Sequence, residues 1–163
     1  NYIDFAALSH VDPQTVLSLL EDENTDPLDP EEYCRFLEDL KHCTKLLYIT
    51  DNCGEIVLDK LAVKVLKEQY PNIHITVLVR GFPTVNDATM EDAAETGMTS
   101  VAEVVGNGSN VCGTWLAGIS KEARELLDSA DLIISKGIST ICSSANASGS
   151  SSSFMPAPWK VCF

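Results

Sequence analysis

Carboxylate and amide side chains gather in two short segments of this sequence, and a lysine follows a third. Asp51 and Asn52 stand together in the first segment, Asp87 lies in the second, and Lys136 follows the apolar run 132–135. Carboxylate and amide oxygens are the ligands that hard divalent cations such as Mg²⁺ and Mn²⁺ prefer. A lysine opposite such a cation suits a phosphate group. The residue types therefore indicate a site for a divalent metal and a phosphate.

Short apolar runs precede these segments and predict the strands that would position them. We expect strands at 46–50, 73–79, 101–105 and 132–135, alternating with helices at 55–69, 90–95 and 121–128. This alternation is typical of an α/β fold with a mainly parallel sheet and right-handed crossovers. Ligands of such sheets bind beyond the carboxyl ends of the strands, so the polar segments should meet at one edge.

The two ends of the chain do not follow that pattern. Asp12-Pro13 and Asp29-Pro30 each combine an N-cap residue with proline at the first helical position, which predicts two helices. Residues 143–153 are almost entirely Ser, Ala, Asn and Gly, a flexible composition. We expect a helical segment at 1–44, belonging to an N-terminal bundle, an α/β core at 45–142 and a Ser-rich, divergent tail at 143–163.

Composition excludes several classes of function. The chain has 24 acidic against 11 basic residues and a formal net charge of −13, which argues against nucleic acid as a partner. It has no apolar run of the roughly 18–20 residues that span a bilayer and no signal-peptide pattern, so we expect a cytoplasmic protein without a membrane partner. The six cysteines lack metal-ligand spacing and are expected to be free, mostly buried thiols.

Each polar feature, taken singly, also has a structural interpretation. Asp51 and Asn52 could end a strand and cap the helix that follows, and spacing alone does not decide between capping and metal binding. Thr89 with Asp92 resembles a capping box, and Asp87 could be a solvated turn residue.

The combination of the segments is more specific than any one of them. The stretches 51–60, 79–93 and 130–137, with the opening Asn1-Tyr2-Ile3-Asp4-Phe5, closely resemble in order and spacing the damage-control metal phosphatases, the domain-of-unknown-function-89 family. The resemblance covers about residues 1–137 and is strongest to the stand-alone form of the family. It implies a Rossmann-like, three-layer, mainly parallel sheet beside a helical bundle.

The resemblance also implies which residues act. Family members hydrolyse phosphate monoesters of small metabolites, including sugar phosphates, with a bound Mn²⁺, Mg²⁺, Co²⁺ or Ni²⁺ that activates water. Matched by motif, the catalytic metal ligands would be Asp51, Asn52 and Asp87. The phosphate and substrate contacts would come from a second group: Lys136, which could otherwise be a surface lysine, and Glu55, Asn86 and Arg80.

The sequence departs from the family pattern after Lys136-Gly137. The family continues with x-Gly-Asn-aromatic-Glu, whereas this chain has the stretch 138–142, Ile-Ser-Thr-Ile-Cys. We therefore expect a truncated member with a divergent end, and the alternative function is an impaired protein that only binds metal or phosphate. A carboxyl methyltransferase using S-adenosylmethionine is less favoured, because it would need a Gly-rich turn after the first strand. A haloacid-dehalogenase-type phosphatase would need a second Asp where Cys53 stands.

Overall fold

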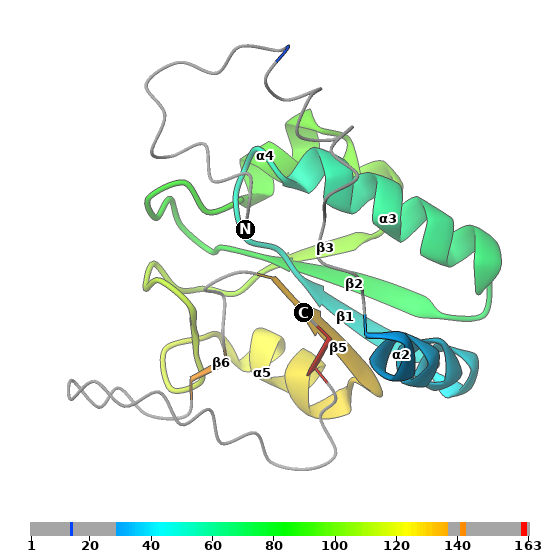
Figure 1. The fold of residues 1–163 in the computed structure, drawn as a ribbon. Coiled ribbons are helices and arrows are strands. Elements are labelled where there is room, and N and C mark those ends of the chain that lie inside the picture. Colours follow the sequence, from blue (N-terminus) through cyan, green and yellow to red (C-terminus); the bar gives the residue numbers. More distant parts are fainter. Residues whose placement is uncertain (1–13, 15–28, 137–140, 143–160, 163) are drawn as a thin grey trace.

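A computed structural model describes residue 14 and the ranges 29–136, 141–142 and 161–162. Apart from Gln14, the helix expected after Asp12-Pro13 lies outside the described residues, and so does the whole Ser-rich stretch 143–153. Within them, the expected alternation of strands and helices is confirmed (Figure 1). Among the described helices, none combines the length and the hydrophobicity that a transmembrane span requires.

The central sheet has five strands, all parallel, in the order β3-β2-β1-β5-β7. Their bounds are Lys45–Ile49 for β1, His74–Val79 for β2, Glu103–Gly106 for β3, Leu132–Ser135 for β5 and Val161–Cys162 for β7. A separate two-stranded sheet pairs β4, Thr114–Trp115, in parallel with β6, Ile141–Cys142. The strand β7 belongs by sequence to the expected tail, yet it adds to the edge of the core sheet beside β5.

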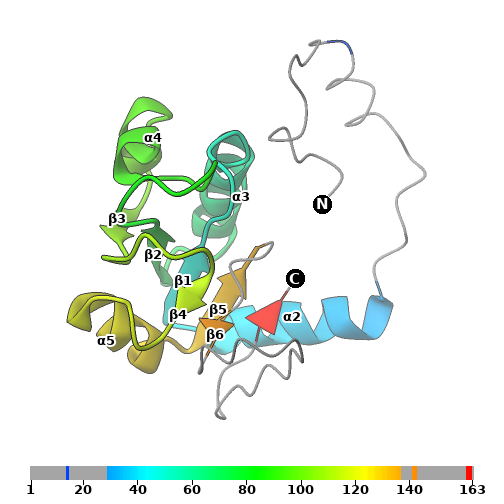
Figure 2. The same cartoon turned by 90° about the vertical axis from the view of Figure 1, so that its left-hand side faces the viewer.

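Helices cover both faces of the sheet and give three layers (Figure 2). They are α2 (Pro30–His42), α3 (Ile56–Gln69), α4 (Met90–Glu95), the 3₁₀ turn η2 (Met98–Ser100) and α5 (Lys121–Ser129). One buried cluster joins β1, β2 and β5 to α2, α3, α4 and η2, and a second joins the opposite sheet face to α5. The α/β, Rossmann-like, three-layer class is thus confirmed.

Local sequence signals account for where two of the helices begin. The Asp29 carboxylate accepts hydrogen bonds from the backbone N–H groups of Glu31 (2.8 Å) and Glu32 (3.2 Å), with Pro30 in the first turn of α2. Thr89 and Asp92 form the expected capping box at the start of α4. The starts of α2 and α4 therefore follow from short-range chemistry.

The third strand starts later than expected. Expected at 101–105, it runs from Glu103 to Gly106, because residues before it form a turn. The chain leaves α4 through Gly97 at φ 73°, and η2 follows. The N–H groups of Val101 and Ala102 then donate to the Met98 carbonyl, so neither is available for strand pairing.

The four cysteines with described side chains are all free, as expected. The expectation that most are buried is wrong for this group, because Cys34, Cys53 and Cys112 are exposed. Only Cys43 is buried, and burial raises the pKa of its thiol to about 11. It is therefore a neutral core residue at physiological pH.

Candidate functional site

The polar segments singled out from the sequence meet at the carboxyl edge of three neighbouring strands. Asp51 and Asn52 follow β1, Asp87 lies in the connection after β2, and Lys136 follows β5. Asn52 and Asp87 form an isolated antiparallel bridge. The N–H of Ala88 donates to the Asp51 carbonyl at 2.8 Å, so the backbone holds the first two connections side by side.

The adjacent Asn86 takes part in this backbone pairing as well. Its carbonyl accepts a hydrogen bond from the N–H of Cys53 at 2.8 Å. A contact of Asn86 with phosphate or substrate stays a prediction. Its observed contribution is to join the two connections.

The side chain of Asn52 is oriented by two carboxylates. Its amide nitrogen donates to Asp51 Oδ2 and to Glu55 Oε1, both at 3.3 Å, and all three residues are buried. Since the amide nitrogen faces the carboxylates, the amide oxygen is directed away from them. That oxygen is the part of the side chain that can serve as a cation ligand.

The start of α3 shows how far Asp51 and Asn52 act as helix caps, the structural interpretation that their spacing left open. The N-cap of this helix is Glu55, whose side chain makes no capping hydrogen bond. The first N–H groups, of Glu55 and Ile56, are bound instead by the backbone carbonyl of Asn52, at 3.1 and 3.3 Å. Asn52 thus supports the helix through its backbone, while its side chain belongs to the polar cluster.

Lys136 is part of a partly buried ion-pair cluster rather than a solvated surface residue. Its ammonium group donates to Glu55 Oε2 at 2.6 Å and to Asp59 Oδ1 at 2.9 Å, and 27% of its side chain is exposed. The Tyr48 hydroxyl donates to the same Asp59 oxygen at 2.8 Å. Glu55 therefore links Lys136 to Asn52, one carboxylate oxygen to each.

The pKa values in this cluster follow from burial and charge. Burial raises the pKa of Asp59, and the hydrogen bond from Lys136 opposes that rise. Burial also acts to lower the pKa of Lys136, but its hydrogen bonds to Asp59 and Glu55 outweigh this and raise it above the ordinary value. Burial next to Asp59 raises the pKa of the Tyr48 hydroxyl strongly. Lys136 is accordingly a cation and Tyr48 a neutral donor at neutral pH.

Arg80 and Asp87 form a second ion pair within the same edge. The guanidinium Nη2 and Nε lie 2.5 and 2.7 Å from Asp87 Oδ2, and Nη1 donates to the carbonyl of Gly113 at 2.5 Å. The Arg80 side chain is only 4% exposed and that of Asp87 14%. Because both bonds go to one carboxylate oxygen, they fix the direction in which Oδ1 points. The observed partners of Arg80 are protein groups, and the expected substrate contact stays a prediction.

The donors at this edge fit a hard divalent cation in type and charge. The carboxylates of Asp51, Glu55, Asp59 and Asp87 stand against the two cations Arg80 and Lys136, four against two, so the formal charge is −2. Among the described residues, no group of three or more His, Cys, Asp or Glu side chains is arranged as a metal site. The expected ligand set is of another kind, two carboxylates and an amide, and its oxygens suit Mn²⁺ or Mg²⁺ rather than a soft metal.

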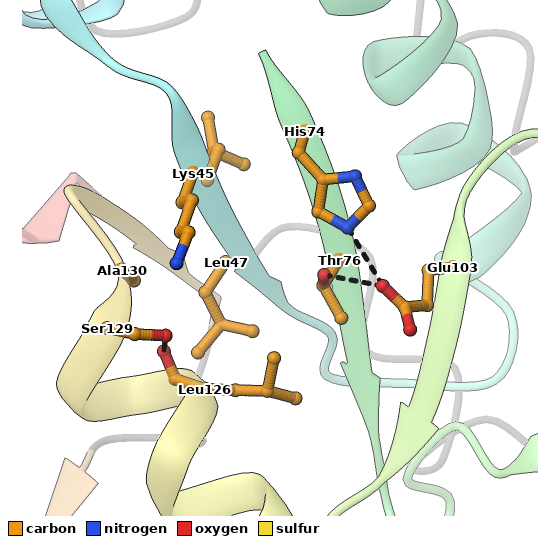
Figure 3. A pocket seen from close by; sticks show the side chains of 9 residues that line it. Lys45, Leu47, His74, Thr76, Glu103, Leu126, Ser129 and Ala130 are labelled. Carbon is orange, nitrogen blue, oxygen red and sulfur yellow. Dashed lines mark hydrogen bonds and ion pairs between the residues drawn. The ribbon is translucent and has the colours of Figure 1, made fainter.

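A pocket of about 220 Å³ lies at the opposite, amino edge of the sheet (Figure 3). Lys45, His74 and Glu103, the first residues of β1, β2 and β3, line it together with the end of α5. His74 Nε2 lies 2.9 Å from the Glu103 carboxylate, to which the Thr76 hydroxyl also donates. None of the residues expected at the functional site lines this pocket.

Two members of the carboxyl-edge cluster, Tyr48 and Asp59, lie outside the predicted set of metal ligands and substrate contacts. Tyr48 could have been found, because a tyrosine inside an apolar strand requires a partner for its hydroxyl. Asp59 carries a related signal: it lies four residues after Glu55, on the same face of a helix that is otherwise apolar in its first turn.

Comparison with known proteins decides the family. Residues 1–141 match the family model of the damage-control phosphatase ARMT1-like domain. The chain belongs to this family. The resemblance carried by the three polar segments is thereby confirmed, and the ion-pair cluster and the Asn52–Asp87 bridge are features of an ARMT1-like domain.

Individual relatives of this ARMT1-like chain match it over most of its length. An uncharacterized protein of Methanocaldococcus jannaschii is 37% identical over 140 residues, which is 85% of this chain and 45% of the relative. A damage-control phosphatase of Pyrococcus horikoshii is 31% identical over 137 residues, 84% of this chain and 47% of the relative. The chain therefore spans about half the length of the curated relatives it matches.

A solved structure supports the fold of the domain independently. The crystal structure of a domain-of-unknown-function-89 family protein from Pyrococcus horikoshii superposes with a TM-score of 0.71 at 30% sequence identity. The superposition covers 83% of this chain and 46% of that structure.

Proposed function

We propose that this chain forms the metal- and phosphate-binding part of a divalent-metal-dependent phosphatase. Its substrates would be phosphate monoesters of small metabolites, such as sugar phosphates, and it would act in the cytoplasm, without nucleic acid or membrane as a partner. The observation that carries the proposal is the Asn52–Asp87 bridge, which joins the expected metal ligands of two connections at one edge of the sheet. Membership of the ARMT1-like family supports the reaction class.

The proposed ligands are Asp51, Asn52 and Asp87, which would hold Mn²⁺, Mg²⁺, Co²⁺ or Ni²⁺. A divalent cation bound there would polarise the phosphate ester and lower the pKa of a water molecule. The protein's own contribution is to direct the ligand atoms. Asp51 and Glu55 orient the Asn52 amide, and Arg80 holds one oxygen of Asp87.

The charge of the edge makes phosphate binding conditional on the metal. A phosphate dianion that approaches a formal charge of −2 is repelled, and a bound divalent cation removes that repulsion. Lys136 is the basic group that we propose to face the phosphate. Glu55 would act through its hydrogen bonds to Lys136 and Asn52 rather than by touching an anion itself.

A second candidate is a family member that binds metal or phosphate without turnover. The stretch 138–142 lacks the Gly-Asn-aromatic-Glu residues that the resemblance implies after Lys136. The two functions differ in one respect only, whether a bound phosphate ester is cleaved.

The test is a phosphate-release assay on the full chain with a panel of sugar phosphates, with and without Mn²⁺. We expect Mn²⁺-dependent release that Asp87→Ala lowers by more than about 100-fold, because a metal ligand should matter at least as much as the partners that orient it. Asp128→Asn, in an exposed ion pair of α5, is the matched control and should keep activity within about twofold. Thermal stabilisation by Mn²⁺ without release would favour the second candidate.

A further inference from the structure

Asp59 has no place in the proposed reaction, yet it is among the most buried charged residues of the domain. It lies in the first turn of α3 and is 2% exposed. Its Oδ1 accepts from the Tyr48 hydroxyl at 2.8 Å and from the Lys136 ammonium at 2.9 Å. Its Oδ2 is buried and has no hydrogen-bond partner among the residues that the structure describes.

Stability alone does not account for a carboxylate in this position. Removing an ionised carboxylate from water is costly, and a buried ion pair often contributes no more than apolar side chains of similar size would. The unpartnered Oδ2 increases that cost. The buried carboxylate is explained if it has a functional role. Its two hydrogen-bond donors, the Tyr48 hydroxyl and the Lys136 ammonium, indicate that this role concerns Lys136.

The contacts converge on the Lys136 ammonium from one helix. Glu55, the N-cap of α3, and Asp59, in its first turn, both accept hydrogen bonds from Lys136 Nζ, at 2.6 and 2.9 Å. Lysine has a long, flexible side chain, and two fixed acceptors restrict its end to one place. Tyr48, projecting from β1, fixes the Asp59 oxygen that makes the second of these bonds.

We propose that Asp59, oriented by Tyr48, is a positioning residue that holds the Lys136 ammonium at the carboxyl edge of the sheet for an incoming phosphate group. This inference rests on the proposed function for the identity of the ligand, but not for the hold on Lys136. A lysine that is already ordered loses less freedom when an anion binds, so the arrangement increases affinity for phosphate. Asp59 itself does not touch the substrate.

The hold on Lys136 is tested by NMR of lysine ammonium groups in the ¹⁵N-labelled full chain. The Lys136 signal is assigned by its loss in Lys136→Arg. We expect it to be visible in the native protein, because two carboxylates slow its exchange with water, and to shift or vanish in Asp59→Asn. Tyr48→Phe should shift it in the same direction by less. Native protein without the signal, or an unchanged signal in Asp59→Asn, would overturn the proposal.

Asp131→Asn supplies a matched control at the other end of the same strand. The Asp131 carboxylate accepts from the Thr44 hydroxyl at 2.6 Å just before β5 begins, whereas Lys136 follows the end of β5. This variant also removes a hydrogen-bonded carboxylate and should lower stability, but it should leave the Lys136 signal in place. A general loosening of the fold would affect both variants alike.

The role in phosphate binding is tested by calorimetry with inorganic phosphate and Mg²⁺-loaded protein. Asp59→Asn also removes one negative charge from the edge, which by itself favours phosphate. We nevertheless expect phosphate binding to weaken about tenfold while Mg²⁺ affinity stays within about twofold, because the lost order of Lys136 outweighs the smaller repulsion and an outer partner typically contributes 10–100-fold. Lower stability with both affinities unchanged would mean a merely structural role and would overturn the proposal. If the native protein shows the Lys136 ammonium signal but binds no phosphate, the proposed function is contradicted. The positioning of Lys136 by Asp59 is then still supported by the NMR result.

Discussion

Asn52 and Asp87 pair through an antiparallel bridge although they lie on the connections that follow two different parallel strands. The bridge consists of two hydrogen bonds between their neighbours, from the N–H of Ala88 to the Asp51 carbonyl and from the N–H of Cys53 to the Asn86 carbonyl, both 2.8 Å long. The proposed ligand set is therefore assembled by the backbone, before any side chain or ion contributes. A rigid frame of this kind restricts where the ligand atoms can lie.

Replacement of Arg80 should destabilise the fold as well as the site. Arg80→Met leaves the Asp87 carboxylate without its partner, and breaking a buried pair in this way costs about 3–5 kcal/mol. Arg80→Lys should recover only part of this, because an ammonium group cannot reproduce the fixed fork of a guanidinium, which contacts Asp87 Oδ2 and the Gly113 carbonyl at once. Urea unfolding measures the difference.

The exposed pair of Arg124 with Asp128 is the comparison for Arg80. Its side chains are 45% and 56% exposed, so Arg124→Met should cost less than about 1 kcal/mol. Equal losses for Arg80→Met and Arg124→Met would show that the Arg80 pair does not stabilise the edge.

Gly81 allows the connection after β2 to pass close to the one after β3. A Cβ at Gly81 would lie 2.4 Å from the backbone nitrogen of Gly108. Gly81→Ala should therefore force the two loops apart and cost about 1–3 kcal/mol, as overpacking usually does. Gly106→Ala, whose new Cβ would meet nothing closer than 3.5 Å, should be tolerated. Thermal unfolding of both variants checks this, and equal midpoints would contradict the close approach.

How much of this architecture the sequence predicts depends on the range of the interaction. The capping box of Thr89 and Asp92 and the strand 132–135 were found correctly because each depends on neighbouring residues only. The strand β7 was not, because its two residues pair with β5 across a long stretch of chain and carry no periodic pattern. The late start of β3 was missed since a 3₁₀ turn has no clear sequence signal.

The candidate site shows the same limit. Its residue types and strand ends were predicted from the motif, and the segments do come together. The ion pairs of Arg80 with Asp87 and of Lys136 with Asp59 were not predicted. A basic residue beside expected metal ligands was instead interpreted as a contact for the phosphate group of the substrate. Partner choice among buried charges depends on three-dimensional distance, which spacing along the chain does not give.

Asp131 should make part of the stability sensitive to acid. Hydrogen bonds from the hydroxyl and N–H of Thr44 and the N–H of Lys45 hold the pKa of Asp131 below its ordinary value. A carboxylate with a lowered folded pKa contributes stability above its unfolded pKa of about 3.9, and this contribution is lost as the pH falls through the folded value. The stability gap between native protein and Asp131→Asn should therefore shrink below about pH 4. Urea unfolding at pH 7 and pH 3 measures it, and a gap independent of pH would contradict the role of the charge.

The central claim, that Asp51, Asn52 and Asp87 share one divalent cation, is tested most directly by titration calorimetry of Mn²⁺ into the full chain. The account predicts one Mn²⁺ per chain, an affinity that falls at least about tenfold in both Asp51→Asn and Asp87→Asn, and no change in Asp128→Asn. Folded native protein that takes up no Mn²⁺, or that binds it equally well after either ligand substitution, would contradict the account.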